Sequence, residues 1–183
     1  MPVLDVDGIS LYYTVKGKGI PIVFINPPVL TCVNFKYQVE ELSKDFQVIT
    51  FDIRGHGRSQ YSEQPVTYPL IVEDIKRLLD HLKIKKAFIC GYSIGGSVAL
   101  EYLLNSADRS LGGIVISGMS EVREKYLKKK ISLGISLASK RAVPILALSI
   151  SWSNSSTKQF FIQQFKETKK GNKVILVRLE TSP

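Results

Sequence analysis

The segment that most constrains this chain is Phe88–Gly96, with the sequence Phe-Ile-Cys-Gly-Tyr-Ser-Ile-Gly-Gly. Its apolar start is typical of a buried strand, and a helical pattern begins at Ile94. A serine on such a sharp strand-to-helix bend projects its hydroxyl above the sheet, where it can attack a carbonyl carbon. The bend brings backbone into near contact, so the residues at Gly91 and Gly95 must be small. An ordinary strand–helix connector is the alternative interpretation.

The helix that follows this bend supports the first interpretation. Its free N–H groups and the positive end of its dipole would point at an oxyanion formed beside the serine. Ser93 is therefore the candidate nucleophile.

Strand and helix signals alternate along the chain as far as Ser117. Short apolar runs predict strands at Val3–Val6, Ile9–Val15, Pro21–Ile25, Phe46–Phe51, Ala87–Cys90 and Gly113–Ser117. Helical spacing predicts helices at Phe35–Leu42, Pro69–Leu82 and Ile94–Leu104. Strands separated by helices pair in parallel through right-handed crossovers, so we expect a doubly wound, mostly parallel α/β sheet. The opening hairpin at Asp7–Gly8 would add an antiparallel edge.

The charge and the pattern both change near Ser120. Residues 1–119 hold 12 Lys+Arg and 12 Asp+Glu, whereas residues 120–183 hold 13 and four, which accounts for the whole net charge of +9. From there the predicted helices follow one another without intervening strands, at 121–141, 144–151 and 156–169. We therefore divide the chain into a core (1–119), a helical segment (120–172) and a tail (173–183). The tail has strand composition, and its structure is uncertain.

The basic second part has two interpretations. In the first, the positive charge attracts anionic substrates or an acidic membrane surface. In the second, which we prefer, it forms a solvated helical face. No nucleic-acid-binding motif accompanies the charge, so we expect no nucleic-acid partner. We do not expect membrane association, because the longest apolar stretch, Ala142–Trp152, is interrupted by Pro144 and too short to span a bilayer. Met1–Asp7 does not resemble a secretory signal, and we expect a cytoplasmic protein.

Cysteine and histidine are too few and too scattered to indicate a metal site. The two cysteines, Cys32 and Cys90, do not make a disulfide framework, and Cys90 ends an apolar strand as a small buried residue would. Neither they nor the two histidines, His56 and His81, have metal-ligand spacing. We expect neither a metal nor a cofactor.

Two motifs of this sequence resemble motifs of the α/β-hydrolase superfamily, and they follow the strands in the same order. Gly91–Gly96 follows the fifth predicted strand, and Asp52–Ser59 looks like the D-x-R-G-x-G-x-S loop that follows the fourth strand in the esterase and haloperoxidase-like branch. In this loop Asp52 and Arg54 can satisfy local backbone groups. The resemblance covers the core, and residues 121–172 resemble the helical cap inserted after the sixth strand. It implies a serine hydrolase that transfers the acyl group of a small carboxylic ester or similar substrate, with Ser93 as the nucleophile.

The resemblance also implies where an oxyanion would be bound. The first donor would be the backbone N–H of Ile94, and the second would come from the loop after the third strand, which begins at Asn26. Alignment through Phe35 places Pro28 at the second donor position, and proline has no N–H group. Either Val29 donates through a shifted turn, or the oxyanion hole is weak.

The chain departs from the family pattern where the rest of the catalytic triad belongs. In the family the acid and the histidine lie on strands that follow the cap, and this chain stops before either. His56 and His81 are expected to be a loop and a surface residue rather than the base. Glu121 lies where some members keep their acid, and an exposed residue in a cap helix is the alternative.

We therefore expect an incomplete hydrolase core, truncated before its final strands, with an exposed sheet edge and impaired activity, because a serine without a base is a weak nucleophile. Whether this polypeptide is itself an enzyme stays open at the level of sequence. A non-catalytic ligand-binding protein, or a degenerate fragment of a hydrolase, is the alternative.

Overall fold

The architecture is a six-stranded mixed sheet with helices on both faces. The structure is a computed structural model and describes residues 2–118, 123–139 and 143–170. The strands are β1 (Val3–Val6), β2 (Ile9–Lys16), β3 (Ile20–Ile25), β4 (Phe46–Phe51), β5 (Ala87–Tyr92) and β6 (Ser110–Ile116). Their spatial order is β1-β2-β4-β3-β5-β6. The doubly wound α/β class predicted from the alternating pattern is confirmed.

The sheet combines an antiparallel hairpin with a parallel block. β1 pairs with β2 across the turn at Asp7 and Gly8, whose φ values of +55° and +77° are those of a type I′ hairpin turn. β2 then pairs antiparallel with β4, and β4, β3, β5 and β6 are parallel to their neighbours. The chain reverses its direction of travel across the sheet between β3 and β5, and ligands bind at such switch points in open α/β sheets.

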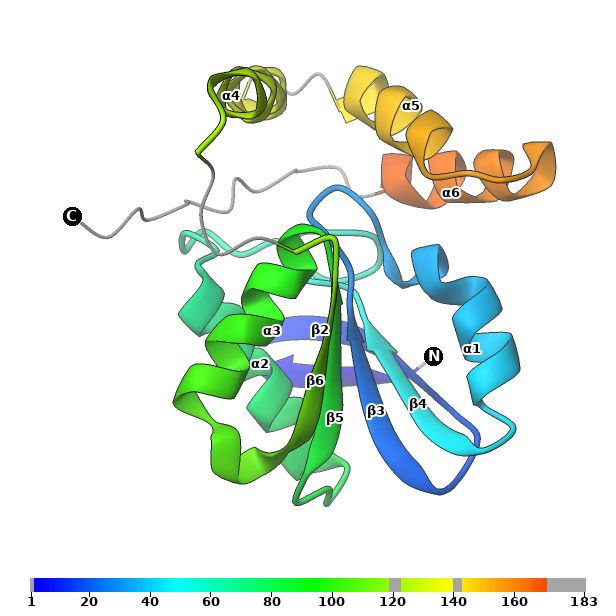
Figure 1. Cartoon of the computed structure of the whole chain (residues 1–183), viewed down its shortest axis with the longest axis vertical. Coiled ribbons are helices and arrows are strands. Elements are labelled where there is room, and N and C mark those ends of the chain that lie inside the picture. The colour runs from blue at the N-terminus through cyan, green and yellow to red at the C-terminus, as the bar shows by residue number, and fades with distance from the viewer. Residues whose placement is uncertain (1, 119–122, 140–142, 171–183) are drawn as a thin grey trace.

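Helices cover the two faces of the sheet unequally (Figure 1). α2 (Tyr68–His81) and α3 (Ile94–Asn105) lie on one face, where they form the larger apolar core with residues such as Ile75, Leu78 and Tyr102. The short helix η1 (Cys32–Phe35) and α1 (Lys36–Leu42) lie on the other face over a smaller cluster around Phe24 and Phe35. A second short helix, η2 (Ala107–Arg109), leads into β6.

β6 begins three residues earlier than the sequence predicted, at Ser110 rather than Gly113. Its pairing with β5 shifts register beside Ala87, and Gly112 has a φ of +151°. This irregularity lets the strand continue through two glycines that look like a break in the sequence.

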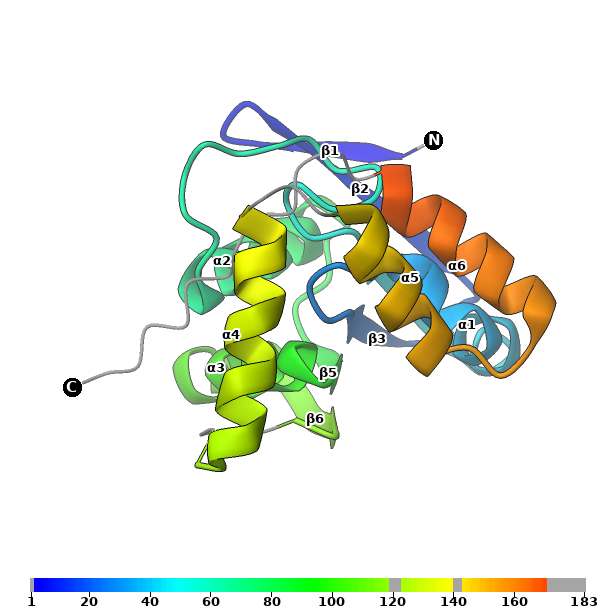
Figure 2. The same cartoon turned by 90° about the horizontal axis from the view of Figure 1, so that it is seen from above.

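Three helices form a separate layer over the carboxyl ends of the parallel strands (Figures 1 and 2). They are α4 (Lys125–Ser139), α5 (Val143–Ser153) and α6 (Lys158–Lys170), called here the helical layer. All three helices predicted in this part of the chain are therefore present, with shifted ends. The predicted boundary at Ser120, the residue Glu121 and the segment 173–183 lie outside the described residues.

Candidate active site

The candidate nucleophile lies on a strained turn between β5 and α3. Ser93 has φ +55° and ψ −123°, an unfavourable backbone conformation for a residue with a side chain. The turn is held by two backbone hydrogen bonds, from the Ser93 N–H to the Ile116 carbonyl of β6 and from the Gly96 N–H to the Ser93 carbonyl, both 2.8 Å long. Ser93 is the N-cap residue of α3, but its hydroxyl makes no capping hydrogen bond. The Ser93 hydroxyl therefore does not occupy the N–H groups at the start of α3, of which that of Gly96 donates to the Ser93 carbonyl instead.

The two glycines around this turn are required by close backbone contacts. A Cβ atom at Gly91 would overlap the carbonyl group of Gly95, and one at Gly95 would overlap the Ile25 carbonyl oxygen. Because the obstructing atoms are backbone, no side-chain rotation could relieve the clash. The prediction that both positions must be small is confirmed. The same contacts place the start of α3 directly beside the end of β3.

The loop after β3 forms a turn that brings Val29 to the same edge of the sheet. Leu30 N–H donates to the Pro27 carbonyl over 3.3 Å, and Val29, inside the turn, has a φ of +76°. That conformation is rare for a β-branched residue. Pro28 has no N–H to donate, whereas the Val29 N–H is not used to close the turn. Of these two candidates for the oxyanion site, only Val29 has the required group.

Asn26 holds this turn from inside the protein. Its side chain is fully buried, and its Nδ2 donates to the Pro27 and Leu30 carbonyls over 3.2 and 2.7 Å. Its Oδ1 is buried without a hydrogen-bond partner among the described residues. The amide therefore fixes the shape of the loop, a role that the sequence analysis did not assign to it.

The loop after β4 braces the same region from the other side. The Asp52 carboxylate accepts hydrogen bonds from the backbone N–H groups of Cys32 and Arg58 over 2.7 and 3.0 Å. Burial raises the pKa of Asp52, and these hydrogen bonds act in the opposite direction. As predicted, Asp52 satisfies local backbone groups, and it links the loop after β3 to the loop after β4.

Arg54 does not have the role that the sequence predicted for it. Its guanidinium forms a buried bidentate ion pair with Asp74 of α2, with N–O distances of 2.7 and 2.6 Å. The sequence analysis missed Asp74. A signal for it was present, because position 74 falls on the apolar face of the helix beside Ile71, Ile75 and Leu78. A carboxylate on such a face needs a buried cation.

Neither histidine hydrogen-bonds to Ser93. His56 is buried, its Nδ1 lies 2.9 Å from the Arg54 carbonyl, and burial lowers its pKa. Its Nε2 has no hydrogen-bond partner among the described residues. His81 is exposed on α2 and its Nε2 lies 3.1 Å from the Tyr13 hydroxyl. These places match the loop and surface roles expected for the two histidines.

Comparison with known proteins identifies the fold family. A sequence model of the alpha/beta hydrolase fold family matches residues 31–174, which is most of the chain. The chain belongs to this family.

Individual relatives are similar to this chain over shorter segments. It is 32% identical over 96 residues to the AB hydrolase superfamily protein YisY of Bacillus subtilis, covering 52% of this chain and 36% of the relative. It is 44% identical over 63 residues to 3-oxoadipate enol-lactonase 1 of Acinetobacter baylyi, covering 34% and 23%. The chain thus spans about a third or less of the length of these two relatives.

Among solved structures, the enol-lactonase from Burkholderia xenovorans LB400 superposes on the chain with a TM-score of 0.75 and 23% identity. The superposition covers 97% of this chain and 75% of the lactonase. At this level of identity the similarity shows the shared fold.

Side-chain contacts attach the helical layer to the rest of the described structure. The hydroxyl of Tyr92, the residue before Ser93, donates to Asn154 Oδ1 over 2.9 Å. Gln164 of α6 donates to Asn34 Oδ1 over 2.9 Å, and the Tyr37 ring lies 5.2 Å from the Phe160 ring. These contacts hold α6 and the end of α5 over the carboxyl edge of the sheet.

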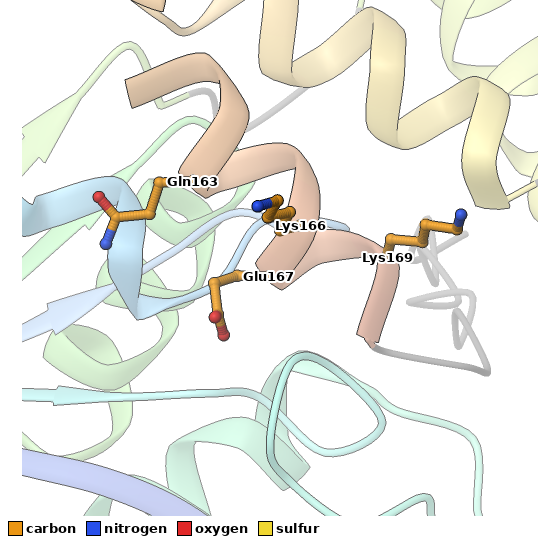
Figure 3. A pocket seen from close by; sticks show the side chains of 4 residues that line it. All are labelled: Gln163, Lys166, Glu167 and Lys169. Atoms are coloured by element: carbon orange, nitrogen blue, oxygen red, sulfur yellow. The ribbon is translucent and has the colours of Figure 1, made fainter. Parts of the chain in front are cut away.

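Two surface hollows are formed by residues of the helical layer and do not include Ser93. One, of about 310 Å³, is lined by the α6 side chains Gln163, Lys166, Glu167 and Lys169 (Figure 3). Glu167 forms an ion pair with Arg58 over 3.2 Å, which links α6 to the loop after β4. The other, of about 590 Å³, lies around the turn between α5 and α6 and includes Trp152 and Phe161. Neither of these hollows is lined by Val29 or Ile94.

Proposed function

We propose that this chain carries the nucleophile and oxyanion site of a serine hydrolase that cleaves small carboxylic esters or similar acyl compounds. The observation that carries the proposal is Ser93, held at a positive φ between β5 and α3 of an α/β-hydrolase fold, with its hydroxyl not used as a helix cap. Strained backbone of this kind is retained where the surrounding structure imposes it, often at active sites.

In the proposed reaction the Ser93 Oγ bonds to the carbonyl carbon of the ester while its proton passes to a base. The carbonyl oxygen becomes an oxyanion, which accepts hydrogen bonds from the N–H groups of Ile94 and Val29. The C–O bond to the alcohol then breaks, the alcohol leaves with a proton, and water hydrolyses the acyl-serine. Removal of one oxyanion donor typically costs about 10²–10³ in rate, so Val29 is the important second donor.

The relatives support an ester-type substrate. Those reported above include two enol-lactonases, and a lactone is a cyclic ester. An esterase from Exiguobacterium antarcticum superposes on the chain with a TM-score of 0.79 at 21% identity. In the proposal the helical layer acts as the cap that covers the acyl site, and residues 120–172 select the substrate. Glu121 is proposed as the acid of a triad. It lies outside the described residues.

A second candidate function, ligand binding without catalysis, is favoured by one observation. Both histidines of the chain make their hydrogen bonds elsewhere, so neither activates the Ser93 hydroxyl. A serine without a base is a poor nucleophile.

Covalent labelling of the purified chain distinguishes the two candidates. We expect a fluorophosphonate probe to add one adduct by intact mass, slowly, and added imidazole to accelerate labelling by supplying the missing base. Ser93→Ala should abolish the adduct. Ser117→Ala is the matched control, because Ser117 follows the neighbouring strand β6 and also has a positive φ of +51°. An adduct that persists in Ser93→Ala contradicts the proposal, and no adduct even with imidazole favours the binding function.

A further inference from the structure

α5 carries a stripe of apolar side chains that remain more than half exposed. Ile145, Leu148 and Trp152 have exposed fractions of 60%, 52% and 76%. Their spacing of three and four residues places them on one face of the helix. The helix also has a packed side, since Leu146 and Ala147 are buried and α5 packs against α6. The stripe is therefore solvent-exposed on a helix that is packed on another side, and its Trp152 ring also lies edge-on to the Phe161 ring of α6, 5.9 Å away.

α4, which belongs to the same helical layer, carries a cluster of lysines in its amino-terminal half. Its sequence holds four lysines, at 125, 128, 129 and 130, and no acidic residue. Tyr126 and Leu133 on the same helix are 67% and 62% exposed, and Lys130 Nζ lies 4.7 Å from the centre of the Tyr126 ring. α4 packs mainly against α5, and the two helices converge at the carboxyl end of α4 and the amino end of α5 and diverge toward their other ends (Figure 2).

We propose that this α4–α5 face docks onto the surface of an anionic lipid bilayer. A helix pair that exposes aliphatic side chains and a tryptophan and also carries lysines has the composition of segments that lie in the membrane interface. The apolar stripe would enter the boundary between headgroups and acyl chains, and the lysines would contact anionic headgroups. Among the described residues no helix is long and apolar enough to cross a bilayer, so the proposed contact is one of surface docking.

Charge favours this occupant over a second copy of the chain. Residues 120–183 hold 13 basic and four acidic residues, whereas residues 1–119 hold 12 of each. Two copies that met through the α4–α5 face would bring their lysine clusters together, which is unfavourable. Attraction to an anionic surface strengthens membrane binding about fivefold for each lysine that lies near the surface.

Trp152 is the only tryptophan in the chain, so its fluorescence reports on this face alone. The experiment adds vesicles of phosphatidylcholine, with or without about one third phosphatidylglycerol, to the full chain at low salt. We expect a blue shift of the Trp152 emission and co-flotation with the anionic vesicles, both reversed by salt. Neutral vesicles should produce little of either.

Charge variants test the role of the lysines. Replacing Lys128, Lys129 and Lys130 with Gln should weaken partitioning on the order of 10²-fold. The matched control replaces Lys83, Lys85 and Lys86, which are exposed at the amino end of β5, and should bind normally. Leu148→Ser should reduce both partitioning and the blue shift by removing apolar contact.

The proposal is overturned by any of three results. These are the absence of a shift with anionic vesicles, equal weakening by the two lysine triples, and a concentration-dependent shift without vesicles, which would indicate a second copy on this face. None of these readouts requires catalysis, so they are independent of the labelling of Ser93.

Discussion

At the scale of single residues, the candidate site is marked by backbone conformations that cost free energy. Val29, Ser93 and Ser117 follow the neighbouring strands β3, β5 and β6, and all three have positive φ values. Such conformations cost about 1–3 kcal/mol each and persist only when the surroundings impose them. Here the close approach of Gly95 to β3 and the hydrogen bond from Ser93 to Ile116 supply the constraint.

The close contact at Gly95 leads to a prediction about stability. Gly95→Ala should lower the free energy of unfolding by about 3 kcal/mol, because its Cβ would meet the rigid Ile25 carbonyl. Gly134→Ala is the matched control: nothing lies within 4 Å of a Cβ there, and alanine should raise helix stability by about 1 kcal/mol. Urea unfolding followed by circular dichroism measures both. Equal effects of the two substitutions would show that the packing at the turn is loose.

At the scale of elements, side-chain hydrogen bonds connect the helical layer to the carboxyl edge of the sheet. The bond from Tyr92 to Asn154 is the one closest in sequence to Ser93. A hydrogen bond of this kind contributes about 1 kcal/mol, which is enough to shift local opening but not to define the fold.

Removing the Tyr92 hydroxyl should therefore loosen α5 and α6 selectively. In Tyr92→Phe we expect amide hydrogen exchange in these helices to be about fivefold faster, with exchange in α2 unchanged. Tyr37→Phe is the control, because Tyr37 contacts the helical layer through its ring, which phenylalanine retains. The idea fails if the two variants accelerate exchange equally.

At the scale of the whole molecule, β6 forms one edge of the described sheet and is largely uncovered. Leu111, Ile114, Val115 and Ile116 are each at least 39% exposed, and β6 has no charged residue. At the other edge β1 contains Asp5. An exposed apolar edge strand is a template for pairing with another chain.

We therefore expect the chain to self-associate through β6 as its concentration rises. Ile114→Lys should suppress this association, because a charge on an edge strand opposes pairing. Val3→Lys makes the same change on β1 at a residue that is 52% exposed and should have little effect. Light scattering over a concentration series measures both, and similar behaviour of the two variants would assign the association to another surface.

The sequence by itself determined the elements and the turn at Ser93. Hydrophobic periodicity is a local property, so β1 to β5 and the helices α1 to α6 could be predicted to within a few residues. Gly91 and Gly95 could also be predicted to be small, because the constraint arises within a few residues of Ser93. β6 was misjudged at its start, because Gly112 and Gly113 look like a break and only pairing with β5 extends the strand.

Only the tertiary structure decided which side chains meet and which stay uncovered. Arg54 pairs with Asp74, Asn26 shapes the loop after β3, and the stripe from Ile145 to Trp152 stays exposed. Each outcome depends on elements that are distant in sequence and packed together by burial of apolar surface. The local pattern assigns a residue to one side of a helix or strand, but the neighbour on that side is chosen by the packing of the whole chain.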